Sequence, residues 1–322
     1  MQSPLPPSND SAPPDALPDA PPHHKLHADE PDVDTPLVRR LIAAQFPRWA
    51  GLPVERFPSS GTVNAVFRLG DTMAVRLPRT PGGADDVAME SRWLPWLAPQ
   101  LPVAVPAVLG RGEPGEGYPW AWSVHRWLDG ANPVAGELTA PGPLAADLAA
   151  FLAALRRADP SDGPPAYRGG PLAAVDTETR NALAELRELA VGLDLAAATA
   201  VWDAALRAPA WEGPPVWVHS DLMPGNLLVR AGRLDAVIDF GTAGVGDPAC
   251  DLIAAWNLLP AGVRAEFRAG TGADDATWER GRGWALSMAL IQLPYYAVTN
   301  PVIAANARHV IREVLADHAR QG

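Results

Sequence analysis

Short runs in which apolar and polar residues alternate occupy the first part of the chain after residue 35. Such alternation predicts strands that bury one face. The predicted strands are residues 54–57, 63–69, 72–77 and 120–127. Gly70 and Asp71 separate the second strand from the third and are typical of a two-residue hairpin turn. We therefore expect an antiparallel sheet, with one helix over residues 37–46 before it and another over residues 84–93, bent or ended by Pro95.

Beyond Gly130, apolar residues recur at three- and four-residue spacing, which predicts helices with one buried face. The first such face consists of Leu144, Leu148, Phe151, Leu152 and Leu155. Further helices are predicted around residues 183–189 and 195–206. Residues 284–307 contain no charged side chain, but polar residues and prolines interrupt them, which favours two buried helices joined near residues 299–301 over a membrane span. The pattern predicts an α+β fold in which a small antiparallel sheet precedes a mainly helical part.

Composition separates a tail from the rest of this 322-residue chain. Residues 1–35 are rich in Pro, Asp, Ala and Ser, with too few large apolar groups to offset the entropy of ordering, so we expect them to be disordered. The tail lacks the basic start and apolar run of a signal peptide. It also holds more than half of the net charge of −11. An acidic chain without a basic face argues against nucleic acid as a partner.

Two rare residue types narrow the chemistry. Cys250 is the single cysteine, which excludes an intrachain disulfide and suits a reducing compartment such as the cytoplasm. Lys25 is the only lysine and lies in the predicted tail. A phosphate-binding loop built on lysine is therefore excluded from the folded part, and any phosphate bound there must be neutralised by arginine.

Polar residues that hydrophobicity does not explain flank a predicted hairpin, formed by residues 227–229 and 236–238. A hairpin brings its open ends together, so Asp221 and Asn226 from one end should face Asp239 from the other. One carboxylate and one amide, with water and phosphate completing the shell, suit Mg²⁺, and we assign Asn226 and Asp239 as its ligands. Asp221 is placed to accept a proton from a hydroxyl group. The alternative is that these polar residues only cap a loop.

The same residues carry a family resemblance. The motif H-x-D-x-x-x-x-N, followed by I-D-F-G, resembles the catalytic and metal-binding loops of the protein-kinase fold. The sequel G-x-G-D-P-x-x-D is similar to that of the aminoglycoside phosphotransferase family; its residues are Gly244, Gly246, Asp247, Pro248 and Asp251. This resemblance implies a bilobal kinase-like fold, with an N-terminal nucleotide-binding lobe over residues 36–124, a hinge over residues 125–130 and a C-terminal helical lobe over residues 131–322 that holds the acceptor site.

The resemblance also implies nucleotide-binding residues. They are Ser60, Gly61 and Thr62 in a loop over the phosphates, Arg76 in place of the usual strand lysine, Glu90 as its partner, and Arg126 and Trp127 at the hinge. Arginine can replace lysine here because its guanidinium is a permanent cation that matches phosphate oxygens. An exposed strand arginine and a tryptophan used only for core packing are the alternatives for Arg76 and Trp127.

The remaining motif residues have supporting roles in this interpretation. His219 would brace the loop backbone, and Asp247 and Asp251 would fix the loop, with helix capping as the alternative for both acids. Only residues 242–246 separate Gly241 from Asp247. That connection leaves no room for the activation segment with which protein kinases dock peptides, so we expect a small-molecule acceptor.

The predicted function is transfer of the γ-phosphoryl group from ATP, or GTP, to a hydroxyl group of a small molecule with Mg²⁺ as cofactor. An aminoglycoside or related antibiotic is the expected acceptor. The alternatives are a metabolite kinase of the choline, homoserine or fructosamine type, and a nucleotide-binding regulator without turnover.

Overall fold

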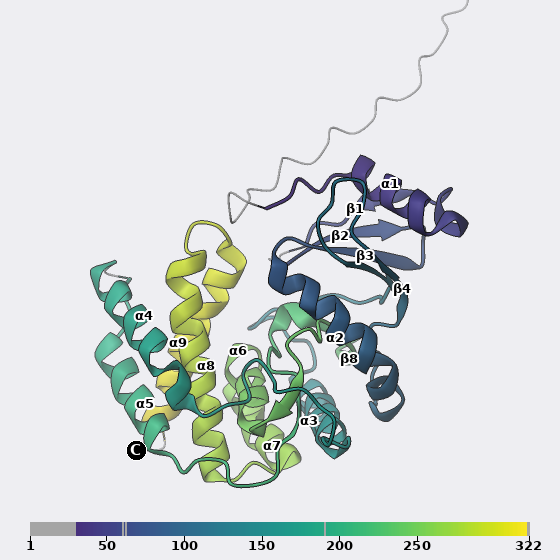
Figure 1. Cartoon of the computed structure of the whole chain (residues 1–322). Coiled ribbons are helices and arrows are strands. Elements are labelled where there is room, and N and C mark those ends of the chain that lie inside the picture. The colour runs from purple at the N-terminus through teal and green to yellow at the C-terminus, as the bar shows by residue number, and fades with distance from the viewer. Residues whose placement is uncertain (1–29, 60, 62, 190, 321–322) are drawn as a thin grey trace, which may run out of the picture.

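A computed structural model describes residues 30–59, 61, 63–189 and 191–320 of the chain. Its N-terminal part is a five-stranded antiparallel sheet with the strand order β1-β2-β3-β5-β4. The strands are β1 (Val54–Arg56), β2 (Asn64–Leu69), β3 (Met73–Pro78), β4 (Val108–Gly112) and β5 (Trp122–Arg126). Phe67, Val75 and Val124 point to one face of this sheet and are fully buried under helix α1 (Thr35–Gln45). Along β2 and β3 the alternation therefore reflects the face covered by α1, whereas β5 is buried on both faces (Figure 1).

Three details of this lobe differ from the sequence prediction, and the first is that β4 was not among the predicted strands. Leu69 pairs with Met73, so the β2–β3 loop has three residues instead of two, and Gly70 takes the left-handed conformation that it needs (φ 57°). Helix α2 (Pro81–Leu97) extends past both predicted ends and contains Pro95 in its last turn. It continues because Leu94 and Leu97 are buried in the core, which stabilises that turn against the loss of one backbone hydrogen bond.

The predicted tail, residues 1–35, lies outside the described residues up to position 29. Of the described remainder, Asp34 caps α1, because its carboxylate accepts a hydrogen bond of 2.8 Å from the backbone N–H of Leu37. The carbonyl of Val33 accepts a 2.6 Å hydrogen bond from Arg56 of β1. These contacts attach residues 33–35 to the N-terminal lobe.

The C-terminal part is mainly helical (Figure 1). Its α-helices are α3 (Pro141–Arg157), α4 (Asp176–Glu188), α5 (Leu195–Arg207), α6 (Ala254–Asn257), α7 (Ala261–Thr271), α8 (Asp275–Tyr296) and α9 (Pro301–Ala319). This part also has the short 3-10 helices η3 (Leu172–Val175), η4 (Pro224–Asn226) and η5 (Pro248–Ile253), whereas η1 (Pro47–Trp49) and η2 (Ala98–Gln100) belong to the N-terminal part. The uncharged residues 284–307 form the end of α8 and the start of α9, as predicted. None of the helices that the structure describes is both long and apolar enough to cross a membrane.

Two small antiparallel sheets connect the helical lobe to the N-terminal lobe. Strands β7 (Leu227–Arg230) and β8 (Arg233–Val237) form the predicted hairpin. Strands β6 (Val216–Val218) and β9 (Gly244–Gly246) form a second pair that the sequence did not indicate. Since β6 leads into Asp221 and β9 follows Asp239, the two sheets together fix both ends of the predicted site. The predicted hinge overlaps the sheet, because β5 includes its first two residues, 125 and 126.

Candidate active site

The segment after β6 is held by a fully buried carboxylate. Asp251 accepts hydrogen bonds from the backbone N–H groups of His219 (2.9 Å) and Ser220 (2.7 Å). Burial raises the pKa of Asp251, while the two backbone donors favour its charged form. Ser220 adopts a positive φ of 64°, a conformation that this clamp maintains. Asp251 thereby fixes the backbone that presents Asp221.

His219 contacts backbone groups on both sides of this segment. Its Nε2 lies 3.0 Å from the carbonyl oxygen of Ile238, an acceptor, which requires the proton to be on Nε2. Its Nδ1 then accepts the backbone N–H of Asp221 at 3.3 Å. The ring therefore links the end of the β7–β8 hairpin to the segment that carries Asp221.

The structure brings Asp221, Asn226 and Asp239 together at the open end of this hairpin. Asn226 donates its amide N–H groups to the Asp221 carboxylate (3.0 Å) and carbonyl (2.8 Å). The carbonyl of Asn226 accepts the backbone N–H of Ile238 at 2.9 Å, directly before Asp239. Asp239 adopts a positive φ of 66°, which turns the chain at this point.

Arg76 joins the two lobes through two carboxylates. Its Nη1 donates to both oxygens of Glu90 (2.9 and 2.7 Å), and its Nη2 donates to Asp239 at 2.6 Å. Burial alone would lower the pKa of Arg76, but the charges and hydrogen bonds of these two acids raise it, so the guanidinium stays charged. Glu90 also accepts the backbone N–H of Phe240 at 2.9 Å. Arg76 is therefore a cross-lobe ion-pair residue and not an exposed strand arginine.

A histidine beside this ion pair stays neutral. The Nε2 of His125 lies 2.8 Å from the hydroxyl of Ser123 and 3.7 Å from a Glu90 oxygen. Burial, together with the charge of Arg76, lowers the pKa of His125 to about 3. Arg76, and not His125, therefore supplies the positive charge next to Glu90 at neutral pH.

Asp86 is a third carboxylate at this junction. Burial and the charges of Asp239 and Glu90 raise the pKa of its carboxyl to about 6. A Cβ atom on Gly241 would lie 2.4 Å from the Asp86 carboxyl carbon, which explains the glycine after Phe240. The sequence predicted a helix beginning near residue 84, which would put Asp86 in its first turn. Because α2 begins at Pro81, the residue instead lies one turn further in, facing the site.

The donors at this site fit Mg²⁺. Asp239 is 35% exposed and offers a carboxylate, and Asn226 uses its amide nitrogen on Asp221, which leaves the amide oxygen as a donor atom. No group of three or more His, Cys, Asp and Glu side chains able to hold a metal ion occurs in the described part of the chain. A metal here would thus take few protein ligands and complete its shell with water and phosphate oxygens, as Mg²⁺ commonly does.

The predicted nucleotide-binding residues outside the ion pair are less closely grouped. Ser60 and Thr62 lie outside the described residues, and the N–H of Gly61 is bonded to the Ser59 hydroxyl at 3.0 Å. Arg126 ends β5 and is exposed. The Trp127 ring packs against Phe57 (ring centroids 5.0 Å apart), with the Arg68 guanidinium 4.5 Å from its centroid. Trp127 thus lies at the β1–β2 side of the sheet.

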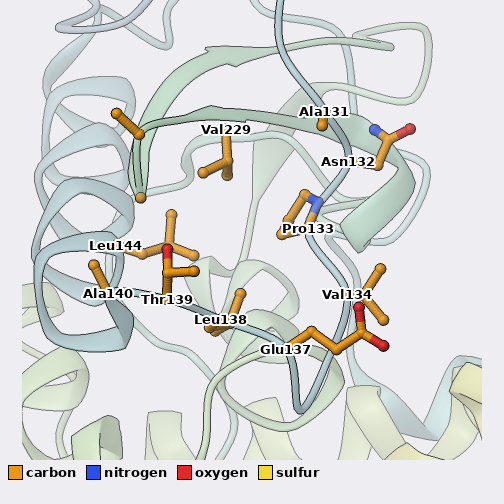
Figure 2. A pocket seen from close by; sticks show the side chains of 12 residues that line it. Ala131, Asn132, Pro133, Val134, Glu137, Leu138, Thr139, Ala140, Leu144 and Val229 are labelled. Atoms are coloured by element: carbon orange, nitrogen blue, oxygen red, sulfur yellow. The ribbon is translucent and has the colours of Figure 1, made fainter.

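A cavity of about 320 Å³ lies between the segment after the hinge and the β7–β8 hairpin (Figure 2). Its lining residues come from residues 131–144 and 229–232, and include none of the predicted site residues. Asn132 at its edge donates to the carbonyls of Gly225 and Leu227, both at 2.9 Å. The cavity is therefore separate from the predicted site residues, although Asn132 supports the loop that carries Asn226.

Sequence reasoning missed a cation that contacts Asp221. Arg168 donates to the Asp221 carboxylate at 3.0 Å and to the carbonyl of Ser220 at 3.1 Å. It also missed the partner of Asp247, which forms a buried bidentate ion pair with Arg280 (2.7 and 3.2 Å). Both arginines are distant from their partners in sequence, and no spacing rule connects them. For Arg168 the only available signal was a single arginine in a loop rich in turn formers.

Comparison with known proteins identifies the family of the chain. A sequence model of the phosphotransferase enzyme family matches residues 54–284, more than half of the chain. The chain belongs to this family. The match confirms the resemblance drawn from the motifs, and with it the prediction of a phosphotransferase. A search of curated protein sequences found no match.

Solved structures of phosphotransferases resemble the chain over most of its length. The GDP complex of aminoglycoside 2'-phosphotransferase-IIIa has a TM-score of 0.68 at 18% identity, covering 89% of this chain and 100% of that chain. A related GDP and kanamycin complex gives 0.67 at 19%, covering 87% and 98%. The macrolide 2'-phosphotransferase MphH from Brachybacterium faecium gives 0.56 at 24%, covering 85% and 97%. At these identities the likeness shows the fold alone, and it confirms the predicted bilobal kinase-like α+β architecture of this family member.

Proposed function

We propose that this phosphotransferase moves the γ-phosphoryl group of ATP to a hydroxyl group of a small molecule. The observation that carries the proposal is the convergence of Asp221, Asn226 and Asp239 at one hairpin end, next to the Arg76–Glu90 ion pair. Structurally similar enzymes include complexes with GDP and with ADP, which supports a purine nucleotide, with GTP as the alternative donor.

Each residue would have a defined role. The acceptor oxygen forms a bond to the γ-phosphorus as the bond from that phosphorus to the β-phosphate oxygen breaks, and ADP leaves. Asp221 would receive the hydroxyl proton. Arg76, steadied by Glu90, would neutralise phosphate charge, and Asn226 and Asp239 would hold Mg²⁺. When bound, Mg²⁺ supplies a compact positive charge that offsets the charge developing on the phosphate oxygens.

The nature of the acceptor follows from the short connection between Gly241 and η5. Residues 242–246 form a tight link that includes β9, which leaves no segment for docking a peptide. Similar enzymes were solved with gentamicin and with streptomycin, and others are macrolide phosphotransferases. An aminoglycoside or related antibiotic is therefore our first candidate acceptor, and a metabolite carrying an alcohol group is the second.

Cys250 is a free buried thiol, which suits a reducing compartment such as the cytoplasm.

A screen of acceptors tests this function. Purified protein with Mg²⁺ and ATP, or GTP, is incubated with aminoglycosides, macrolides, amino alcohols and sugar amines, and ADP or GDP release is followed together with the mass of each compound. We expect one chemical class to gain a phosphoryl group in step with nucleoside diphosphate release. If the nucleotide binds with Mg²⁺ but no compound gains a phosphoryl group, the protein is better described as a nucleotide-binding regulator.

A further inference from the structure

We propose that Arg168 is a positioning residue that holds the Asp221 carboxylate toward the acceptor hydroxyl. The inference rests on the proposed function, because it adds a residue to the same site. Arg168 belongs to none of the motifs that led to the site. It lies in the loop between α3 and η3.

Asp221 is held from two sides. Arg168 donates to one carboxylate oxygen (Oδ1, 3.0 Å), and Asn226 donates to the other (Oδ2, 3.0 Å). A carboxylate accepts about four hydrogen bonds, so both oxygens retain room for a hydroxyl group. The side chains of Arg168 and Asp221 are 23% and 24% exposed, so the pair lies at the rim of the site where an acceptor can reach it.

The backbone of the Arg168 loop is fixed by its neighbours. Four backbone hydrogen bonds of 2.7 to 3.1 Å join residues 164–169 to residues 242–247. Two of them flank Arg168 directly, because Tyr167 donates to the Thr242 carbonyl and Gly169 accepts from the N–H of Asp247. The loop therefore runs beside β9 as an additional extended segment, and the direction of Arg168 is set by the same strand that follows Asp239.

The glycines of the G-x-G-D-P motif permit this approach. A Cβ atom on Gly244 would lie 2.5 Å from the carbonyl oxygen of Pro164, and one on Gly246 would lie 2.5 Å from the Cα of Gly169. Any larger residue would push the loop away from β9. The two glycines of the motif thus do more than form a turn. They let the Arg168 loop pack against β9, and this packing places the Arg168 guanidinium on Asp221.

Arg168 matters because the reaction depends on alignment. Without the guanidinium, the Asp221 side chain is held on one oxygen only and can rotate away from the hydroxyl proton. Displacements of about 1 Å in a reacting group can cost about 10²-fold in rate. Since Arg168 contacts Asp221 and Ser220 and neither Asn226 nor Asp239, its loss should lower kcat and leave nucleotide binding intact.

The test compares Arg168→Gln, Arg168→Lys, Asp221→Asn and the double variant Arg168→Gln/Asp221→Asn. Arg180→Gln is the matched control, since Arg180 pairs with Asp176 and Asp203 on the surface of α4 and α5. For each protein, kcat and KM are measured with the acceptor found in the screen. The rate of ATP hydrolysis, with water as the acceptor, is measured separately without that compound. The Kd for Mg²⁺–ATP and the Tm are measured alongside.

We expect Arg168→Gln to lower kcat by about 10²-fold with unchanged nucleotide Kd, Arg168→Lys to recover part of the loss, and Arg180→Gln to match the wild type. The double variant should be no slower than Asp221→Asn, because Arg168 acts through Asp221. Losses that multiply, or a change in KM alone, overturn the inference. If Arg168→Gln does not fold, the same comparison is made between Arg168→Lys and the double variant Arg168→Lys/Asp221→Asn. Wild-type kcat in Asp221→Asn would instead reject the proposed function itself.

Discussion

We expect the replacement of Asp221 by asparagine to lower the rate of phosphoryl transfer by roughly 10²- to 10⁴-fold, the range that general bases contribute. The asparagine side chain keeps the shape of the carboxylate, so Arg168 and Asn226 retain a neighbour of similar size. It cannot accept the hydroxyl proton. Because Asp221 does not contact Arg76 or Glu90, the affinity for Mg²⁺–ATP should stay within about twofold of the wild type, a difference under 1 kcal/mol.

The measurement is acceptor-dependent ADP release, with nucleotide affinity by calorimetry on the same sample. Asp203→Asn is the control, since Asp203 is an exposed partner of Arg180. A variant at Asp221 that turns over at the wild-type rate would remove the general base from the mechanism. A loss of nucleotide binding equal to the loss of rate would show instead that the substitution disrupts the site.

We expect the replacement of Arg76 by methionine to destabilise the protein by about 3–5 kcal/mol, the cost of leaving a buried charge without its partner. Glu90 is 2% exposed and accepts both hydrogen bonds of the Arg76 Nη1. With the guanidinium gone, Glu90, Asp239 and Asp86 remain close together with no cation between them. Urea unfolding should show this loss directly, and nucleotide affinity should fall because the phosphates lose their arginine.

Two further variants separate stability from binding. Arg233→Met removes an exposed arginine paired with Asp147 and should cost no more than about 1 kcal/mol. Arg76→Met combined with Glu90→Leu replaces the pair with apolar groups and should recover much of the stability but none of the nucleotide affinity. A stable Arg76→Met single variant with normal nucleotide binding would contradict both roles of Arg76.

Much of the architecture could be predicted from the sequence because local patterns determined it. Alternation gave the sheet strands because one face packs under α1, and the β7–β8 hairpin followed from two apolar runs around a turn. The break between α8 and α9 was likewise expected from the prolines and polar residues. In each case the residues that determine the structure are neighbours in the chain.

Contacts between distant segments were not predictable in the same way. The β6–β9 pair has three residues in each strand, and two of those in β9 are glycines, so no periodicity marks it. Arg168 meets Asp221 across 53 positions of sequence, from a loop with no repeating pattern. The start of α2 at Pro81 lies three residues before the predicted one, so Asp86 lies one turn further into the helix than expected. The position of Arg168 beside Asp221 is thus set by tertiary packing.

The effect of Mg²⁺ on nucleotide affinity tests whether Asn226 and Asp239 hold Mg²⁺ beside Asp221. Calorimetric titration of ATP with and without Mg²⁺ needs no acceptor. We predict that Mg²⁺ tightens binding by about tenfold or more, about 1.4 kcal/mol, in the wild type and in Asp221→Asn, and that Asp239→Asn and Asn226→Ala lose this gain. An undiminished Mg²⁺ effect in Asp239→Asn would contradict the account.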